Sequence, residues 1–317
     1  MAILLADAKE RTQDALQQGV IDEFRKSSWL MDHITFDDSV NPSGGGTTLT
    51  YSYTRLKTQP TAAFRAVNSE YTPQEVTTER HNVDLKIFGG AFEIDRVIAN
   101  MGGVVDNVQL QIQQKIKAAN ALFNDTFING DSGTNEIAFD GLDKAVTGSD
   151  TEFVLDTALD MSSAAMIKEN YVEFMFYLDK FLKKLDGTPS FIGGNTDFIS
   201  VIQLCAKLAG RFQETKDDFG RPIETYNGIP LVDFGTKPGT NEQVIKTDES
   251  GISSLYFGRL GLDGIHAASE AGGSPVRTWL PDFATAGAVK KGEVEMLAAI
   301  ALKASKAAGK FTNVKIA

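Results

Sequence analysis

The segment most suggestive of a reaction is the tetrapeptide Gly130-Asp131-Ser132-Gly133. It matches the core of the nucleophile motif of trypsin-type serine hydrolases, in which a histidine deprotonates the serine and a carboxylate orients that histidine. The chain has three histidines, and none stands in a context that indicates such a triad: His33, His81 and His266. The tetrapeptide also follows the end of a predicted helix, and Gly, Asp and Ser favour turns. We therefore predict a helix-terminating turn here and no catalytic residue.

Metal and cofactor sites find no better support in the sequence. One cysteine, Cys205, and three scattered histidines offer no zinc-ligand spacing. The acids Asp140, Asp143 and Asp217-Asp218 do not follow the pattern of a calcium loop. The glycines at 44–46 open a predicted strand and not a helix, so they cannot present a helix N-terminus to a phosphate. The sequence therefore predicts no enzyme, no metal and no cofactor.

The composition fits a protein that encloses material better than a protein that binds nucleic acid. The chain has 317 residues and a net charge of −11, which argues against gripping DNA or RNA through a basic surface. No apolar stretch approaches the roughly 20 residues that span a bilayer, and Asp7 interrupts the start before a signal-peptide core could form. Cys205 has no cysteine partner and lies in an apolar run, so we expect it to be buried in a protein made in a reducing cytoplasm.

The first predicted elements of the chain form an extended N-terminal region. Residues 1–34 carry a thin apolar stripe that includes Phe24, which indicates either an arm lying on another surface or an ordinary first helix. Alternation around Tyr51 and Tyr53 predicts a strand, and the polar stretch 58–73 predicts a long loop. A return strand follows, and Gly89-Gly90 at a change of its apolar phase predicts a bulge or sharp bend.

Three amphipathic helices are predicted in the middle of the chain, over residues 103–128, 163–185 and 197–208. The first carries Val104, Val108 and Phe123 on one face and is long enough to be a structural backbone element. From residue 211 onward the pattern changes to short strands and turns. Helices and strands are thus segregated along the chain, which predicts an α+β fold.

The segment after the long helix resembles a known family. The helix runs into Ile128-Asn129-Gly130-Asp131, and a glycine-rich stretch leads to Asp140-Gly141-Leu142-Asp143-Lys144. This arrangement resembles the major capsid proteins of tailed bacteriophages, whose Hong Kong phage capsid fold is shared with encapsulins. Later strands that start at Tyr226 and Leu255, and a closing strand over 295–303, fall in that family's order.

The resemblance implies the phage major capsid fold with five successive parts. These are an N-terminal arm at 1–36, an extended E-loop ribbon at 37–94, a P domain with a long spine helix at 95–140, an A domain at 141–265, and a return to the P domain at 266–317. The ribbon is expected to drape over an adjacent subunit. Seven residues are expected at subunit contacts: Phe24, Trp29, Tyr51, Tyr53, Lys57, Phe64 and Arg65.

The implied function is structural. The subunit would self-assemble as pentamers and hexamers into an icosahedral shell that encloses double-stranded DNA without sequence-specific binding, in a virion capsid assembled in the host cytoplasm. No membrane is involved. The chain starts without the long extension that some members use as a built-in scaffold, so the resemblance implies a separate scaffolding protein, a portal protein and room for a decoration protein. Some members crosslink through a lysine and an asparagine, but Lys57 has no identifiable partner and is expected to be a solvated charge.

Two alternatives stay open. An encapsulin-type nanocompartment uses the same fold for a shell around an enzyme cargo, and the sequence separates it poorly from a phage capsid. A soluble hydrolase with an unrecognised site belongs to another class and would behave as a small oligomer with a ligand-binding cleft.

A deletion tests the expected role of the ribbon. Removing residues 41–80 is expected to leave a soluble subunit that cannot assemble, because an isolated two-stranded ribbon is only marginally stable and needs a neighbouring surface. Size-exclusion chromatography and electron microscopy would measure this. Normal shells from the deleted chain would contradict the expectation.

Overall fold

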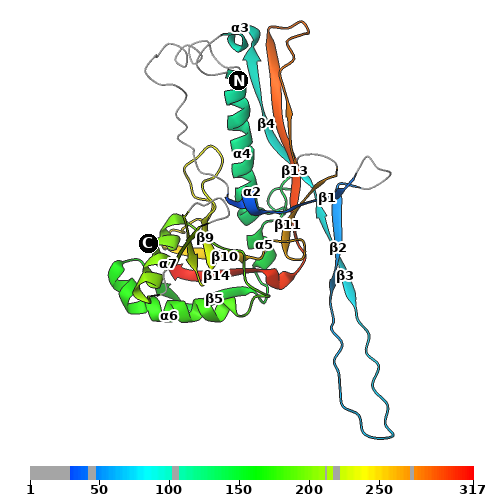
Figure 1. Ribbon diagram of the computed structural model, residues 1–317, viewed down its shortest axis with the longest axis vertical. Helices are drawn as coiled ribbons and strands as arrows, with labels where there is room; N and C mark the ends of the chain where they lie inside the picture. Colours follow the sequence, from blue (N-terminus) through cyan, green and yellow to red (C-terminus); the bar gives the residue numbers. More distant parts are fainter. Residues whose placement is uncertain (1–28, 42–47, 102–106, 211–212, 217–221, 272–274) are drawn as a thin grey trace.

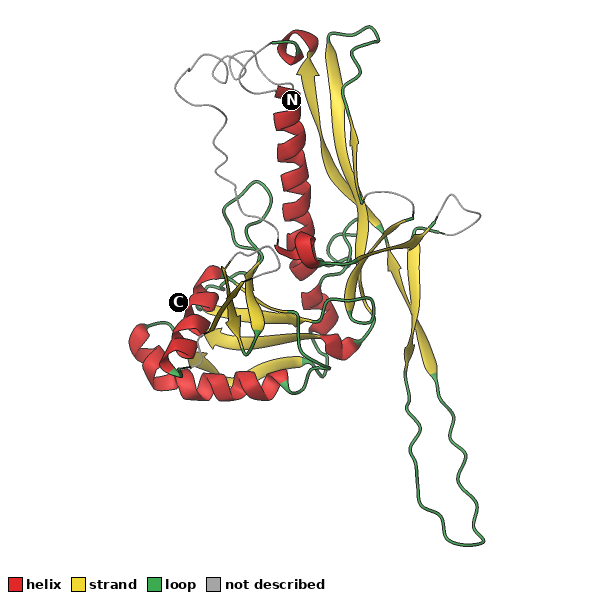
Figure 2. Cartoon of the chain, in the orientation of Figure 1, coloured by secondary structure: helices red, strands yellow, loops and turns green. Residues whose placement is uncertain are grey.

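The computed structural model describes residues 29–41, 48–101, 107–210, 213–216, 222–271 and 275–317 (Figure 1). Among these residues the strands form a five-stranded sheet beside a long helix, a seven-stranded sheet, and a two-stranded ribbon that projects away from both (Figure 2). Helices are combined with sheets whose strand pairs are mostly antiparallel, so the predicted α+β class is confirmed.

The long helix is α4 (Asn107–Asn129), which spans about 35 Å at ~1.5 Å per residue. Its C-terminal half carries the fully buried Phe123, Phe127 and Ile128, and they belong to the larger of two hydrophobic cores. Towards its N-terminus the helix packs with α3 (Arg96–Ala99) in a small separate cluster. The predicted helix position Val104 lies outside the described residues.

The five-stranded sheet is organised around its longest strand, β13 (Val289–Leu302). Antiparallel to it lie β11 (Ile265–Glu270), β12 (Val276–Trp279) and β4 (Lys86–Asp95), while β1 (Phe36–Val40) pairs in parallel with β11. Beside β1 the chain forms the short helix α2 (Trp29–His33).

The bulge predicted at Gly89-Gly90 is wrong. β4 and β13 pair in unbroken register from Asp95 opposite Val289 to Lys86 opposite Ala298. The glycines instead permit close approach, because a Cβ on Gly89 would lie 2.0 Å from the Val294 carbonyl oxygen. Glycines within a strand indicate either a bulge or a close approach of neighbouring backbone, and here they mark a close approach.

The seven-stranded sheet forms a second unit in the order β5-β14-β10-β6-β9-β8-β7. Its strands, in that order, are Glu152–Asp160, Ala308–Lys315, Ile252–Gly258, Phe191–Gly194, Ile229–Asp233, Pro222–Tyr226 and Gln213–Lys216. Leu255 and Phe257 of β10 face the second core with α6 (Ala164–Leu182) and α7 (Thr196–Leu208), whereas Tyr256 faces the first core. This sheet is therefore packed on both faces.

The two helices of this unit begin within one residue of their predicted starts at 163 and 197, whereas α6 ends at Leu182, before the predicted 185. Ser163 and Asn195 cap α6 and α7, because their side-chain oxygens accept hydrogen bonds from the backbone amides of Met166 and Phe198. Two shorter helical pieces complete the fold, α5 (Leu142–Val146) and the 3₁₀ turn η1 (Ser305–Ala307).

The ribbon consists of β2 (Thr50–Leu56) and β3 (Thr78–Asp84), joined by a long loop. The loop is confirmed, but the ribbon expected over 37–94 is too long at both ends. β1 and β4 leave it and hydrogen-bond into the five-stranded sheet. Strand periodicity along the sequence indicates a strand but does not specify its partner, so these boundaries were not visible in the sequence.

The C-terminal part of the chain divides between the two sheets. Residues 266–317 were expected to return to the unit that holds the long helix, and β11, β12 and β13 lie there. β14 does not, because it pairs with β10 and β5 inside the seven-stranded sheet. The expectation is therefore wrong for residues 308–315. No helix in the described part of the chain is both long and apolar enough to cross a membrane.

Packing between β4 and β13 yields a stability prediction. A Cβ added at Gly292 would lie 2.4 Å from the buried ring of Phe92, so Gly292→Ala is expected to destabilise the subunit by about 1–3 kcal/mol through overpacking. Gly90→Ala is the matched control, because its Cβ would meet the flexible side chain of Lys115 at 3.2 Å. Denaturant unfolding measures both variants, and equal losses of stability would contradict this account.

Candidate assembly surface

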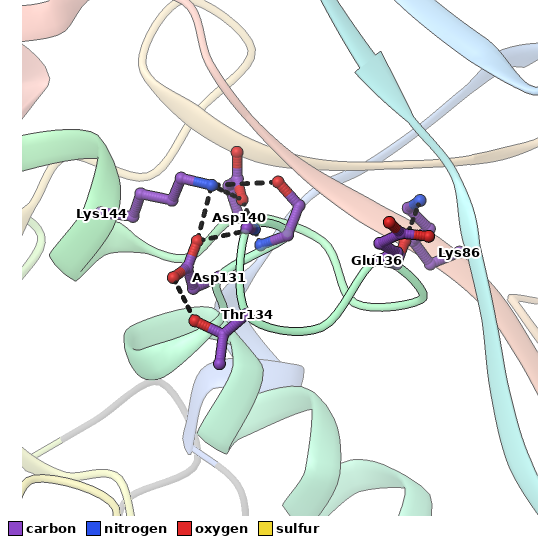
Figure 3. Close-up of polar contacts among 8 residues, drawn as sticks. Lys86, Asp131, Thr134, Glu136, Asp140 and Lys144 are labelled. Atoms are coloured by element: carbon purple, nitrogen blue, oxygen red, sulfur yellow. Dashed lines mark hydrogen bonds and ion pairs between the residues drawn. The ribbon is translucent and has the colours of Figure 1, made fainter.

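The tetrapeptide that resembles a serine-hydrolase motif lies in the loop after α4, where charged side chains form a cluster (Figure 3). The ammonium of Lys144 lies 2.6 Å from Asp131 Oδ1 and 2.8 Å from Asp140 Oδ1, and it donates to Ser132 Oγ at 3.0 Å. The hydrogen bond to Asp131 raises the pKa of Lys144, and Lys144 in turn holds the pKa of Asp131 well below its usual range. A lysine held protonated in this way cannot take a proton from the serine.

No histidine is available to Ser132 as a base, because each has partners elsewhere. His33 bonds to the backbone carbonyl of Trp29, His81 stacks on Tyr53, and His266 contacts Tyr51. The predicted turn is present directly after the end of α4.

The same loop connects the C-terminal end of α4 to β4 and α5. The Gly141 amide donates to the Gly130 carbonyl at 2.8 Å, and a Cβ at either glycine would lie within 2.5 Å of a backbone oxygen. Thr134 Oγ1 donates to Asp131 at 2.6 Å, and Lys86 Nζ of β4 donates to the Glu136 carbonyl at 2.8 Å (Figure 3). The cluster fixes the exit of α4 relative to β4 and α5.

The remaining candidates for chemistry are also structural. Cys205 is buried in α7, and burial raises the pKa of its thiol to about 12, so it is not a reactive thiolate. Within the described ranges, no group of three or more His, Cys, Asp or Glu side chains is arranged to hold a metal ion.

The exposed surface of the ribbon is unusual for a single chain. Its loop carries apolar side chains far from either core: Phe64 is fully exposed, Val67 is 89% exposed and Tyr71 is 60% exposed. Figure 1 shows this loop hanging free of the rest of the molecule. Apolar side chains grouped on a projecting loop mark an interaction site more often than an ordinary surface.

The loop nevertheless has defined cross-connections. Thr58 and Thr77 hydroxyls lie 2.7 Å apart, and the Thr61 amide donates to Gln74 Oε1 at 2.6 Å. At the tip, the Arg65 guanidinium lies 5.5 Å from the centre of the Tyr71 ring and donates to the Ser69 carbonyl at 3.2 Å. These contacts hold the exposed side chains at the tip in one arrangement, which reduces the entropy lost on binding.

The base of the ribbon is anchored on the five-stranded sheet by two sets of polar contacts. Tyr53 donates its hydroxyl proton to the Leu302 carbonyl at 2.7 Å, and Arg55 Nε donates to the Lys303 carbonyl at 2.8 Å. Both acceptors stand at the end of β13. The ribbon therefore leaves the body at a direction set by the end of the longest strand.

The second set of contacts is buried and links three strands. Tyr51 of β2 donates to Asp37 of β1 at 2.7 Å, and its hydroxyl lies 3.2 Å from Nε2 of His266 in β11. Burial and the bond to Asp37 raise the pKa of Tyr51, so it remains a donor. Burial lowers the pKa of His266 to about 4, and the nearby Lys303 adds to this effect, so the imidazole is neutral at pH 7.

No protein-family model and no curated protein matches the sequence of the chain. Solved structures match along nearly its whole length. The holo-SrpI encapsulin complex from Synechococcus elongatus PCC 7942 is similar with a TM-score of 0.66 at 14% identity, over 99% of this chain and 97% of that one. The capsid of the native GTA particle gives 0.54 at 12% identity, over 94% and 95% of the two chains.

The mature capsid of bacteriophage PhiM1 also matches, with a TM-score of 0.55 at 10% identity, over 96% of this chain and 91% of that one. The chain has the Hong Kong phage capsid fold. The fold predicted from the resemblance in sequence is confirmed.

Within the Hong Kong phage capsid fold, the residues expected at subunit contacts divide into three groups. Phe24 lies outside the described residues. Trp29, Tyr51 and Tyr53 contact their own chain: Trp29 stacks on His33 with ring centres 4.2 Å apart, and the two tyrosines anchor the ribbon.

The third group stands on the free part of the ribbon. Lys57 forms an exposed ion pair with Glu79 at 3.7 Å, and Phe64 and Arg65 lie at the tip. These positions leave them open to a partner, so their contacts with a second subunit stay a prediction.

Sequence reasoning missed two kinds of residue. Val67 and Tyr71 share the tip with Phe64, and their signal was an apolar residue recurring every three or four positions in a polar stretch. Asp37 and His266 are 229 positions apart in the sequence and meet only because β1 pairs with β11. No local pattern could have joined them.

The buried histidine gives the subunit a defined pH dependence. Between its ordinary pKa of 6.5 and its native value of about 4, the unfolded chain binds a proton at His266 that the folded chain does not. The free energy of unfolding should therefore fall as pH decreases through this window, by on the order of 1–3 kcal/mol. His266→Gln is expected to flatten this dependence, measured by denaturant unfolding at pH 4 to 7. An unchanged slope would contradict the assignment.

Proposed function

We propose that this chain is the subunit of a closed icosahedral shell assembled from pentamers and hexamers. One observation carries the proposal: the ribbon presents a preformed group of apolar and aromatic side chains that its own body leaves uncovered. A two-stranded ribbon of this kind is marginal in water without a covering surface. A second copy of the chain is the simplest source of that surface.

The geometry favours a ring over a two-fold dimer. The ribbon tip and the surface that would receive it are different parts of the chain, so the contact is head-to-tail. Such contacts close into rings when the rotation between neighbours permits it. The Hong Kong phage capsid fold supports the further step from rings to a shell.

We favour a tailed-phage capsid that encloses double-stranded DNA. The support is the sequence from Ile128 to Val146, which resembles the major capsid proteins of tailed phages. The net charge of −11 fits a wall that surrounds DNA without binding it tightly. This function brings a separate scaffolding protein, a portal protein and a decoration protein as candidate partners, and it places the assembled chain in the virion.

An encapsulin-type compartment is the second candidate. It is supported by the TM-score of 0.66 to the encapsulin complex, which exceeds the 0.54 and 0.55 to the two capsids. Both candidates need the same subunit contacts and differ in what the shell encloses.

The decisive experiment is electron microscopy of the purified chain, expressed alone and together with its neighbouring genes. Closed shells or ring-shaped capsomers are expected. Shells that require a scaffolding gene and fill with DNA favour the phage capsid, whereas shells that form alone and enclose a neighbouring enzyme favour the encapsulin. A small species of uniform size under every condition would contradict the shell function.

A shorter deletion separates the role of the loop from the role of the anchoring residues. Removing residues 41–80 takes away the anchoring Tyr51 and Tyr53 as well as the loop. Replacing only residues 59–76 by a two-residue turn keeps the anchor, because Thr58 and Thr77 already lie side by side. This shorter variant should fold normally and fail to assemble.

A further inference from the structure

The chain contains two Asn-Gly dipeptides, and the structure places them in opposite surroundings. Asn129-Gly130 stands at the C-terminal end of α4, and Asn227-Gly228 joins β8 to β9. An Asn-Gly dipeptide can lose ammonia without a catalyst, because glycine has no Cβ that would keep its amide nitrogen away from the preceding side chain. Folding decides how easily the two residues can reach the geometry that this reaction needs.

The first dipeptide, Asn129-Gly130, is held by hydrogen bonds and by close packing. The Gly130 amide donates to the Thr126 carbonyl at 2.9 Å. The side-chain amide of Asn129 donates to Asp125 at 2.7 Å and to the Val244 carbonyl at 2.8 Å. A Cβ at Gly130 would lie 2.5 Å from the Thr126 carbonyl oxygen, so the backbone there has no room to rotate.

The second dipeptide, Asn227-Gly228, forms an exposed two-residue turn. Its φ angles are both positive, at 51° and 80°, and Tyr226 pairs with Ile229 across the turn. A Cβ at Gly228 would meet no atom within 4 Å. Within the described part of the chain, the Gly228 amide donates no hydrogen bond. Its nitrogen is therefore available to react.

One side-chain contact ties this turn to α6. Asn227 Nδ2 donates to Asp179 Oδ1 at 3.0 Å, and the Tyr226 hydroxyl donates to the same oxygen at 2.8 Å. The turn borders a cavity of about 330 Å³ that Asp179 and Lys183 also line. A polar cavity of this size has room for several water molecules. The turn thus has space to change its conformation and water within reach.

We propose that Asn227 is a site of spontaneous deamidation in this protein and that Asn129 is protected from it. The amide nitrogen of Gly228 attacks Cγ of Asn227, so the N–Cγ bond forms, the Cγ–Nδ2 bond breaks, and the amide proton leaves with ammonia. Water then opens the five-membered imide. Opening at Cγ gives aspartate, whereas opening at the main-chain carbonyl carbon gives isoaspartate, in which the chain runs through the former side chain. This modification does not depend on the proposed shell function.

Deamidation changes the contact between the turn and α6. The new carboxylate stands where the side-chain amide of Asn227 donated to Asp179, so two like charges replace a hydrogen bond. Lys183 lines the same cavity and reduces the repulsion, but it does not replace the lost bond. Isoaspartate also adds a carbon atom to the backbone of a turn whose conformation sets the register of its strands. The attachment of the turn to α6 therefore weakens as the protein ages.

Peptide mapping by mass spectrometry tests the site. The full chain is incubated at pH 6 and at pH 9 and digested at intervals, and each deamidation adds one mass unit. The peptide with Asn227 should react at least about tenfold faster than the peptide with Asn129, because reaction at Asn129 must first break several hydrogen bonds. The rate at Asn227 should be higher at pH 9, since the attacking nitrogen must lose its proton. Equal rates at the two sites, or no mass gain at Asn227, would overturn the proposal.

The unfolded chain is the matched control. In denaturant the two dipeptides have no structure to distinguish them, so their rates should become nearly equal. A tenfold difference that persists in denaturant would assign the effect to local sequence and overturn the structural account. The products test the route, because the imide gives both aspartate and isoaspartate. Aspartate alone would show direct hydrolysis and overturn the attack by Gly228.

A pair of variants tests the weakened contact. Asn227→Asp reproduces one product and should lower the equilibrium constant for folding about fivefold in denaturant unfolding. Adding Asp179→Asn restores one amide and one carboxylate in the opposite order and should recover the loss. An unaffected single variant, or a double variant without recovery, would overturn the predicted weakening and leave the deamidation site standing.

Discussion

The direction of the ribbon depends on a small set of hydrogen bonds at its base. Tyr53 and Arg55 donate to carbonyl oxygens at the end of β13, and Tyr51 donates to Asp37 in a buried site beside His266. Everything beyond this base is a two-stranded segment without a core of its own. A small rotation at the base would move the tip by many ångströms, so the anchoring bonds determine where an apolar tip can meet a neighbour.

The anchor is effective because β13 is a shared element. Its C-terminal half pairs with β11 and its N-terminal half with β4 and β12, while α4 packs across the same strands. The chain then turns through η1 and enters the seven-stranded sheet as β14. The ribbon and the long helix both contact β13, and the second sheet is connected to β13 through η1. These connections to a single strand limit the movement of the three parts relative to one another.

The perturbed ionisable groups of this molecule lie in contacts that join segments of the chain. The ammonium of Lys144 is shared by two carboxylates at the exit of α4, and the imidazole of His266 is kept neutral by burial. In an active site, perturbed groups converge on a cleft that can hold a substrate. Here the perturbed groups lie where segments of the chain join, which is consistent with a structural subunit.

The sequence by itself determined the features that depend on neighbours in the chain. Helical periodicity predicted α4, α6 and α7, and a polar stretch predicted the long loop of the ribbon. The order and spacing of these elements along the chain were sufficient to predict the fold, because the resemblance to the capsid family depended on that order and not on any single motif.

Only the tertiary structure decided which strands pair and which residues meet. Periodicity gives the face of a strand but not its partner, so β4 was placed in the ribbon and β14 beside the long helix, and both placements were wrong. The buried contact of Tyr51 with Asp37 and His266 likewise joins three distant strands. Such long-range contacts depend on the packing of the whole chain, and no local pattern in the sequence records them.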